Sequence, residues 1–186
     1  MQNSLPILGI VASGSNAGKT TLITQLIPVL ALQNIRVSVI KHAHHAFDID
    51  HVGKDSYKIR ESGAAQTLIA SSKRWALMTE MHRLPTLENE ANLSDLVDQI
   101  NPNYADLILV EGFKQATIQQ KPIPKIEVYR PNLDLPLLAS TDSSIIAVAS
   151  DAKLTLQVPL LNLNDIQQIA NFIVLTMINL NPKHNG

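Results

Sequence analysis

The chain has 186 residues and no cysteine. Disulfide bonds, thiolate nucleophiles, cysteine-ligated zinc and iron–sulfur clusters are therefore excluded. Charged residues make up only 17% of the chain, below the roughly 25% that is usual for globular proteins. Because 15 basic residues are set against 16 acidic ones, the net charge is −1. This balance argues against a nucleic-acid binder or a membrane-surface protein that works by bulk positive charge.

Long hydrophobic runs are also missing from the sequence. No apolar run approaches the roughly 18 residues that span a bilayer, and the first residues show no basic segment followed by an apolar stretch, so no secretory signal is predicted. Hydrophobic residues still make up 45% of the chain, enough for a sizeable core. We expect a cytoplasmic protein with one domain over residues 1–180 and a frayed tail over residues 181–186.

Strand-like and helix-like stretches alternate along the chain. Short apolar runs predict buried strands, and apolar residues at helical spacing predict helices. Their alternation predicts an α/β fold, with a mainly parallel sheet, helices on both faces and an antiparallel edge extension. The expected strands cover residues 6–12, 36–41, 67–70, 75–79, 106–110, 126–129, 145–149 and 159–163. The expected helices cover residues 18–32, 54–61, 93–100 and 164–178.

A phosphate-binding loop is predicted between the first strand and the first helix. Glycines allow backbone N–H groups to turn toward anionic oxygens, and the start of a helix adds the positive end of a dipole. Lys19 supplies a charge for the β- and γ-phosphates, and the hydroxyl of Thr20 can bind Mg²⁺. The segment therefore predicts nucleotide binding by Gly14, Ser15, Asn16, Ala17, Gly18, Lys19, Thr20 and Thr21.

One position departs from the usual phosphate-loop pattern. The pattern G-x-x-x-x-G-K-[ST] has glycine six residues before the lysine, but Ser13 occupies that place and Gly14 follows it. A turn of small residues that merely caps a helix is the alternative interpretation. The Gly-Lys-Thr-Thr sequence at a helix start favours nucleotide binding, because a lysine there is unfavourable unless an anion is present.

An acidic residue ends the most apolar strand. Glu111 stands at the carboxyl end of the predicted strand 106–110, whereas Asp106 stands at its start. A magnesium–phosphate site needs a carboxylate at the carboxyl end of a strand beside the loop. We therefore expect Glu111 to hold Mg²⁺, and Asp106 to be a cap or surface residue.

A segment rich in histidine and aspartate follows Lys41 at the end of the second strand. Ligands of open α/β sheets bind at this edge, so Lys41 is expected to contact phosphate or substrate, with Asp48 or Asp50 helping Mg²⁺. A solvated loop or ligand contact is favoured over a dedicated transition-metal site. The potential metal ligands are His42, His44, His45, Asp48, Asp50 and His51.

Asp151 follows the predicted strand 145–149. A carboxylate can accept hydrogen bonds from N1 and N2 of guanine, which makes Asp151 a candidate base reader. Most aspartates at strand ends only cap or turn the chain, and that alternative stays open.

These segments together resemble the molybdopterin-guanine dinucleotide biosynthesis protein B family. The resemblance covers residues 7–172 and is weak over residues 81–103 and 114–143. It is carried by G-K-T-T-L, I-K-H-x-H-H, G-K-D-S-Y, G-A-A-Q-T, R-W-A-L-M-T-E, D-L-I-L-V-E-G-F-K and I-A-V-A-S-D. It implies a three-layer P-loop NTPase fold of the branch that contains dethiobiotin synthetase and the metallochaperone GTPases.

The resemblance also implies an activity and partners. It implies a GTP-binding adapter for molybdenum-cofactor biosynthesis that binds Mg²⁺, hydrolyses GTP weakly, forms a homodimer and assists the guanylyltransferase. Lys19 and Glu111 would then be the catalytic residues, and Thr20, Glu111 and Asp50 the metal ligands. Lys41 and Asp151 would complete the nucleotide site, with Asp151 reading guanine. Two alternatives stay open: a small-molecule kinase or carboxylate-phosphorylating enzyme, and a transition-metal chaperone.

Overall fold

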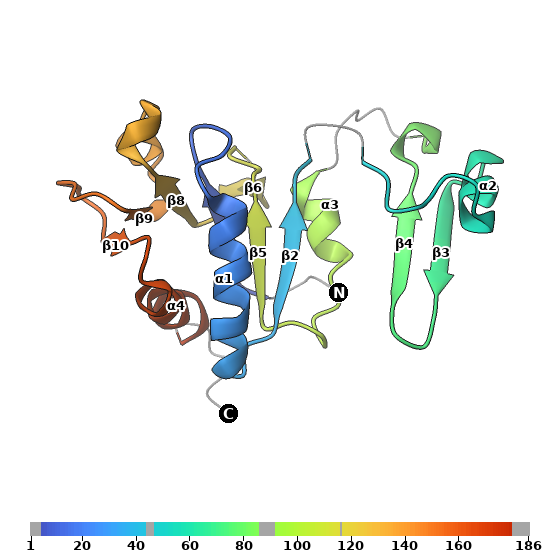
Figure 1. Cartoon of the computed structure of the whole chain (residues 1–186), viewed down its shortest axis with the longest axis horizontal. Helices are drawn as coiled ribbons and strands as arrows, with labels where there is room; N and C mark the ends of the chain where they lie inside the picture. The colour runs from blue at the N-terminus through green and yellow to red at the C-terminus, as the bar shows by residue number, and fades with distance from the viewer. Residues whose placement is uncertain (1–4, 44–46, 86–91, 116, 180–186) are drawn as a thin grey trace. The chain divides into compact units, whose positions relative to one another are not determined.

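The computed structural model describes residues 5–43, 47–85, 92–115 and 117–179 (Figure 1). The chain divides into two compact units. The first unit consists of Met1–His42 and Leu93–Gly186, and the second unit is Ala43–Asn92. The expectation of one domain over residues 1–180 stays a prediction.

A six-stranded sheet forms the centre of the first unit. Its strand order is β10-β9-β8-β1-β5-β2, and each neighbouring pair is parallel. This confirms the α/β class with a mainly parallel sheet. The strands are β1 (Ile7–Val11), β2 (Val37–Lys41), β5 (Leu107–Glu111), β8 (Lys125–Tyr129), β9 (Ile145–Ser150) and β10 (Leu160–Asn162).

Helices cover both faces of this sheet, as Figure 1 shows. Side chains alternate along β5, so Leu107 and Leu109 pack in the cluster that contains α1 (Lys19–Leu32) and α4 (Ile166–Ile173). Ile108 and Val110 pack on the other face against α3 (Leu93–Asp98). All five residues of β5 are buried, which explains why its sequence is almost continuously apolar. A π-helix, η4 (Val174–Ile178), continues α4.

Short elements complete the first unit. A hairpin is formed by β6 (Thr117–Ile118) and β7 (Lys121–Pro122). Two 3₁₀ helices, η2 (Pro131–Leu133) and η3 (Leu138–Ser140), lie in the connection from β8 to β9.

The second unit contains α2 (Asp55–Glu61), the antiparallel pair β3 (Gln66–Ala70) and β4 (Trp75–Thr79), and a 3₁₀ helix, η1 (Met81–Arg83). The antiparallel pair agrees with the sequence expectation. Among the described residues it forms a two-stranded sheet of its own and is not hydrogen-bonded to the edge of the parallel sheet. The hydrogen bonds of the ladder join β3 and β4 to each other.

Within the described ranges, no helix has the length and apolar character needed to cross a membrane.

The buried face of α1 predicts a local difference in stability. Leu26 is fully buried in the core, whereas Leu32 on the same helix is 86% exposed. We expect Leu26→Ala to lower the free energy of unfolding by about 2–5 kcal/mol, because it removes buried apolar atoms and leaves a cavity. Leu32→Ala is the matched control and should change it by less than about 0.5 kcal/mol. Urea denaturation followed by circular dichroism measures both, and equal effects would contradict the assigned packing.

Candidate functional site

The predicted phosphate loop leaves the central strand β1 at the carboxyl edge of the sheet and enters α1. Gly18 precedes the helix in the left-handed region, with φ 102°, and Asn16 has φ 60°. Within the described residues, no side chain caps the first turn of α1, and that turn contains no acidic residue. The N–H groups at this helix start are therefore oriented as an anion site requires.

Ser13 departs from the usual motif without straining the backbone. The positive-φ residues of the loop are Asn16 and Gly18, so a serine at position 13 carries no steric penalty. The side chain of Ser13 donates a hydrogen bond to the carbonyl of Pro136. Its own carbonyl accepts one from Nζ of Lys114 at 2.7 Å. The serine at position 13 thus makes contacts that hold the start of the loop.

Gly14 packs closely against the end of the Leu135 side chain. A Cβ atom at position 14 would lie 2.6 Å from Cδ1 of Leu135, so the end of that leucine side chain would have to move. Leu135 belongs to the connection between η2 and η3, so this connection packs directly against the loop.

Lys19 points back into the loop. Its Nζ donates a hydrogen bond to the carbonyl of Gly14 at 3.1 Å. Burial lowers the pKa of Lys19 below its usual value, and the nearby charges of Lys114 and Lys41 lower that pKa further, while Glu111 opposes them. The ammonium of Lys19 is therefore partly removed from solvent, with one carboxylate and two further ammonium groups acting on it.

Thr20, Lys41 and Glu111 meet beside Lys19. The hydroxyl of Thr20 donates to Oε1 of Glu111 at 2.8 Å, and Nζ of Lys41 donates to that hydroxyl at 3.2 Å. Lys41 and Glu111 also form an ion pair of 3.0 Å. The side chain of Glu111 is only 10% exposed, while that of Lys41 is 53% exposed.

The sheet register explains why these three residues meet. Lys41 and Glu111 are direct partners in the parallel pair of β2 and β5. Ile10 of β1 is the partner of Glu111 on the other side, so the loop that follows β1 starts next to this carboxylate. The edge predicted from the sequence thus brings together Lys19, Thr20, Lys41 and Glu111.

Asp151 also lies at this edge, but it is paired with an arginine that the sequence analysis did not select. Nη1 of Arg130 lies 2.5 Å from Oδ2 of Asp151, and Nε of Arg130 donates to the carbonyl of Ala17 at 3.2 Å. The strand register that joins Tyr129 to Ser150 places the next residue of each strand side by side. A basic residue directly after a strand of the parallel sheet is the signal that could have identified Arg130.

Lys114 is the second cation that the sequence analysis did not assign. It follows β5 by three residues and is bonded to the loop through the carbonyl of Ser13. Lys114 follows β5 and Arg130 follows β8, which are the two strands that neighbour β1. Both residues lie in a stretch for which the sequence offered few recognisable features.

Two buried charged residues of β8 hold the connection that packs on the loop. Glu127 has no exposed surface and accepts backbone hydrogen bonds from Leu138 and Ala139 at 2.8 and 2.9 Å. Burial raises the pKa of Glu127, and these hydrogen bonds oppose that increase. Lys125 is paired with Asp142 at 2.9 Å. Together these contacts hold the part of the connection that follows Leu135 and Pro136 against β8.

The remaining predicted ligands are placed differently. His42 stacks on Phe113 with ring centroids 4.6 Å apart. Asp50 belongs to the second unit, where its Oδ1 accepts hydrogen bonds from Ser56 and from its neighbour His51. In the part of the chain that the structure describes, no three histidine or acidic residues group as a metal site, while His44 and His45 lie outside it. The role of Asp50 as a metal ligand stays a prediction.

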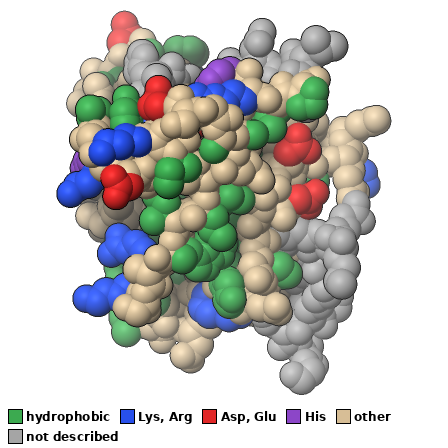
Figure 2. Space-filling model, turned by 90° about the vertical axis from the view of Figure 1, so that its right-hand side faces the viewer, with side chains coloured by type: hydrophobic (Ala, Val, Ile, Leu, Met, Phe, Trp, Pro, Cys, Tyr) green, Lys and Arg blue, Asp and Glu red, His purple; other side chains and the backbone are tan. Residues whose placement is uncertain are grey.

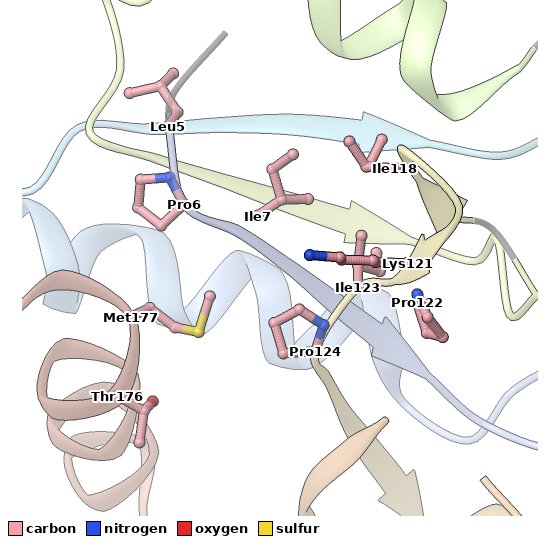
Figure 3. Close-up of a pocket in the computed structure, with 10 residues that line it drawn as sticks. All are labelled: Leu5, Pro6, Ile7, Ile118, Lys121, Pro122, Ile123, Pro124, Thr176 and Met177. Atoms are coloured by element: carbon pink, nitrogen blue, oxygen red, sulfur yellow. The ribbon is translucent and has the colours of Figure 1, made fainter. Parts of the chain in front are cut away.

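A pocket of about 390 Å³ lies at the opposite, amino-terminal end of β1 (Figure 3). Its lining is mostly apolar and includes residues that begin β1 and precede β8, together with Lys121 of β7 and Met177 of η4. The pocket shares no residue with the phosphate loop and is separate from the site.

Proteins of known name resemble this chain in sequence. Residues 7–151 match the family model described as "Molybdopterin guanine dinucleotide synthesis protein B". The chain is 43% identical to the molybdopterin-guanine dinucleotide biosynthesis adapter protein of Haemophilus influenzae, over 93% of this chain and 90% of that protein. It is 44% identical to the Escherichia coli protein of the same name, over 98% and 97% of the two chains.

Solved structures show the same fold. A crystal structure of molybdopterin-guanine biosynthesis protein B superposes with a TM-score of 0.65 at 29% identity, covering 91% of this chain and 98% of that one. The MobB structure of Bacillus subtilis has a TM-score of 0.68 at 21% identity, covering 94% and 99%.

The charges around Lys19 predict that substitutions of its neighbours change the pKa of Lys19. We expect Lys114→Gln to raise the pKa of Lys19 toward its usual value of 10.5, because a repelling charge is removed. Glu111→Gln should lower that pKa further, because an attractive charge is lost. Lysine-selective NMR titration measures both shifts. Lys121→Gln, in the separate pocket, is the control; an unmoved Lys19 in the Lys114 variant would contradict the arrangement.

Proposed function

The chain belongs to the molybdopterin guanine dinucleotide synthesis protein B family, and from this premise we propose that it is a GTP-binding adapter in the synthesis of that dinucleotide. The phosphates of GTP are held by the loop from Gly14 to Thr21. The role is a cytoplasmic one. Its partners are molybdenum-cofactor biosynthesis proteins, the guanylyltransferase among them.

One observation supports the nucleotide assignment. Three lysines lie near the start of α1, which no described side chain caps, and the carboxylate of Glu111 lies among them. The charges of Lys41 and Lys114 act on Lys19, and Glu111 is the acidic group that opposes them there. Such an excess of positive charge is unfavourable unless a multiply charged anion is bound. A triphosphate supplies that charge, and the bond from Lys19 to the carbonyl of Gly14 is one that the ammonium can exchange for phosphate oxygens.

The donor set near Lys19 fits magnesium. Thr20 and Glu111 offer a hydroxyl and a carboxylate oxygen 2.8 Å apart, and Mg²⁺ prefers oxygen ligands of this kind. The ammonium of Lys41, which contacts both oxygens, indicates that this position favours a positive charge. When bound, the ion would neutralise charge on the phosphates.

Weak hydrolysis of GTP is part of the proposal. Lys19 is positioned to stabilise the charge that develops on the γ-phosphoryl oxygens, with Glu111 completing the catalytic pair. Lys19 orients the phosphates, and Glu111 would act through the Mg²⁺ that it would hold. Water attacks the γ-phosphorus in line, the bond from that phosphorus to the β–γ bridging oxygen breaks, and GDP and inorganic phosphate are released.

A homodimer is also proposed, and the antiparallel pair of the second unit supports it. Leu68, Trp75 and Leu77 share one face of β3 and β4 and are 62%, 60% and 41% exposed. Figure 2 shows hydrophobic side chains gathered at the centre of the face that it presents. Adjacent exposed apolar residues on a two-stranded sheet are stabilised when a second copy covers them.

The loop assignment predicts the effect of removing its lysine. We expect Lys19→Ala to weaken GTP binding at least about tenfold, because a charge-assisted contact to phosphate is lost. Calorimetric titration with GTP and ATP, each with and without Mg²⁺, measures the affinity, and circular dichroism checks the fold. Lys121→Ala removes an equivalent charge far from the loop and should bind normally. Unchanged affinity in the Lys19 variant would rule out the proposed phosphate site.

The dimer proposal predicts a monomer when its apolar face is charged. Leu68→Glu should shift the chain from dimer to monomer in sedimentation velocity, because a carboxylate would be buried without a partner. Leu175→Glu is a closely matched control, since Leu175 is also 62% exposed but lies on η4 of the first unit. Dissociation by the control alone, or by neither variant, would refute this interface.

A further inference from the structure

Arg130 joins the phosphate loop to Asp151. Its Nε donates to the carbonyl of Ala17 at 3.2 Å, two residues before Lys19, and its Nη1 contacts Oδ2 of Asp151 at 2.5 Å. The side chains of Arg130 and Asp151 are 34% and 30% exposed. Both are therefore held by the fold and still reachable from solvent, at a place directly beside the loop.

Arg130 has hydrogen-bond donors that are not used within the described part of the chain. Among the described residues, its Nη2 makes no hydrogen bond, and it lies 3.8 Å from the place where a Cβ atom at Gly18 would stand. Oδ1 of Asp151 likewise accepts no hydrogen bond in the described part of the chain. The pair thus offers an open donor next to an open acceptor.

We propose that Arg130 is a specificity-determining residue, which together with Asp151 selects guanine over adenine for the nucleotide held by the loop. The inference rests on the proposed function, because it needs a nucleotide whose phosphates occupy that loop. Nη2 of Arg130 donates to O6 of the base, and the open Oδ1 of Asp151 accepts from N1–H and from the 2-amino group.

The chemistry of the two purines explains the selection. The edge of guanine presents an acceptor, O6, followed by donors on N1 and N2, which matches a donor from Arg130 followed by acceptors from Asp151. Adenine presents the reverse order at the same atoms: its 6-amino group would face the guanidinium, and its unprotonated N1 would face the carboxylate. Both contacts would be unpaired or repulsive, and buried unpaired polar groups are what selective sites use to reject a substrate.

The bond to Ala17 gives Arg130 a second role as a positioning residue. Asp151 follows β9, and the guanidinium of Arg130 ties its side chain to the phosphate loop. The distance between the base-reading groups and the phosphate-binding groups is thereby set by one rigid, planar side chain.

The test compares four ligands with the intact chain in the presence of Mg²⁺: GTP, ITP, ATP and inorganic tripolyphosphate. ITP keeps O6 and N1–H but lacks the 2-amino group. We expect Arg130→Ala to lower the preference for GTP over ATP about tenfold and that for ITP over ATP by a similar factor, while tripolyphosphate affinity changes less than about threefold. Arg130→Lys keeps the charge and should give an intermediate preference, and it carries the test if the alanine variant does not fold.

Arg36→Ala is the matched control. Arg36 forms an ion pair of 2.8 Å with Asp106 at the amino ends of β2 and β5. The substitution therefore removes the same kind of pair from the opposite edge of the sheet. Its base preference should equal that of the unchanged chain.

Two results would overturn the inference while leaving the proposed function intact. One is an unchanged preference in Arg130→Ala. The other is an equal loss for all four ligands, which would mean that Arg130 only supports the loop. If the unchanged chain binds neither tripolyphosphate nor any nucleotide, the proposed function itself fails and this inference with it.

Discussion

The parallel pairing of β1 between β5 and β8 is the constraint on which the site depends. It makes the loop after β1 leave the sheet between the carboxyl ends of its neighbours, so the side chains that follow those strands must face the loop. Glu111 approaches from one side and Arg130 from the other. A shift of one residue in either pairing would turn these side chains to the wrong face.

Charge then determines what the site can hold. Burial lowers the pKa of Lys19, and Lys114 and Lys41 lower it further against the opposing effect of Glu111, so a charged Lys19 without a bound anion costs the protein free energy. Sites of this kind gain affinity for a multiply charged ligand because the repulsion is relieved on binding. The buried residues Lys125 and Glu127 contribute indirectly, since they hold the segment that packs on Gly14.

Local patterns predicted much of this from the sequence. The apolar strand before Glu111 and the Gly-Lys-Thr-Thr helix start have strong local signals, and the structure brings Lys19, Thr20 and Glu111 together. The pairs that depend on register between distant strands had a weaker signal: a basic residue after a strand can mark Arg130, but it does not identify the partner of Arg130. Arg130 and Asp151 are 21 residues apart in the sequence, and Lys114 and Ser13 are 101 residues apart. Their contacts are therefore visible only in the folded sheet. The sequence pattern of β3 and β4 likewise did not predict that these two strands form a separate sheet.

The most direct measurement of the central claim is a crystal structure of the chain with Mg²⁺ and a non-hydrolysable GTP analogue. The account predicts that the β- and γ-phosphates lie within hydrogen-bond distance of the backbone N–H groups of residues 17–21, and that Nζ of Lys19 has exchanged the carbonyl of Gly14 for phosphate oxygen. A nucleotide bound elsewhere, with Lys19 still bonded to Gly14, would contradict it.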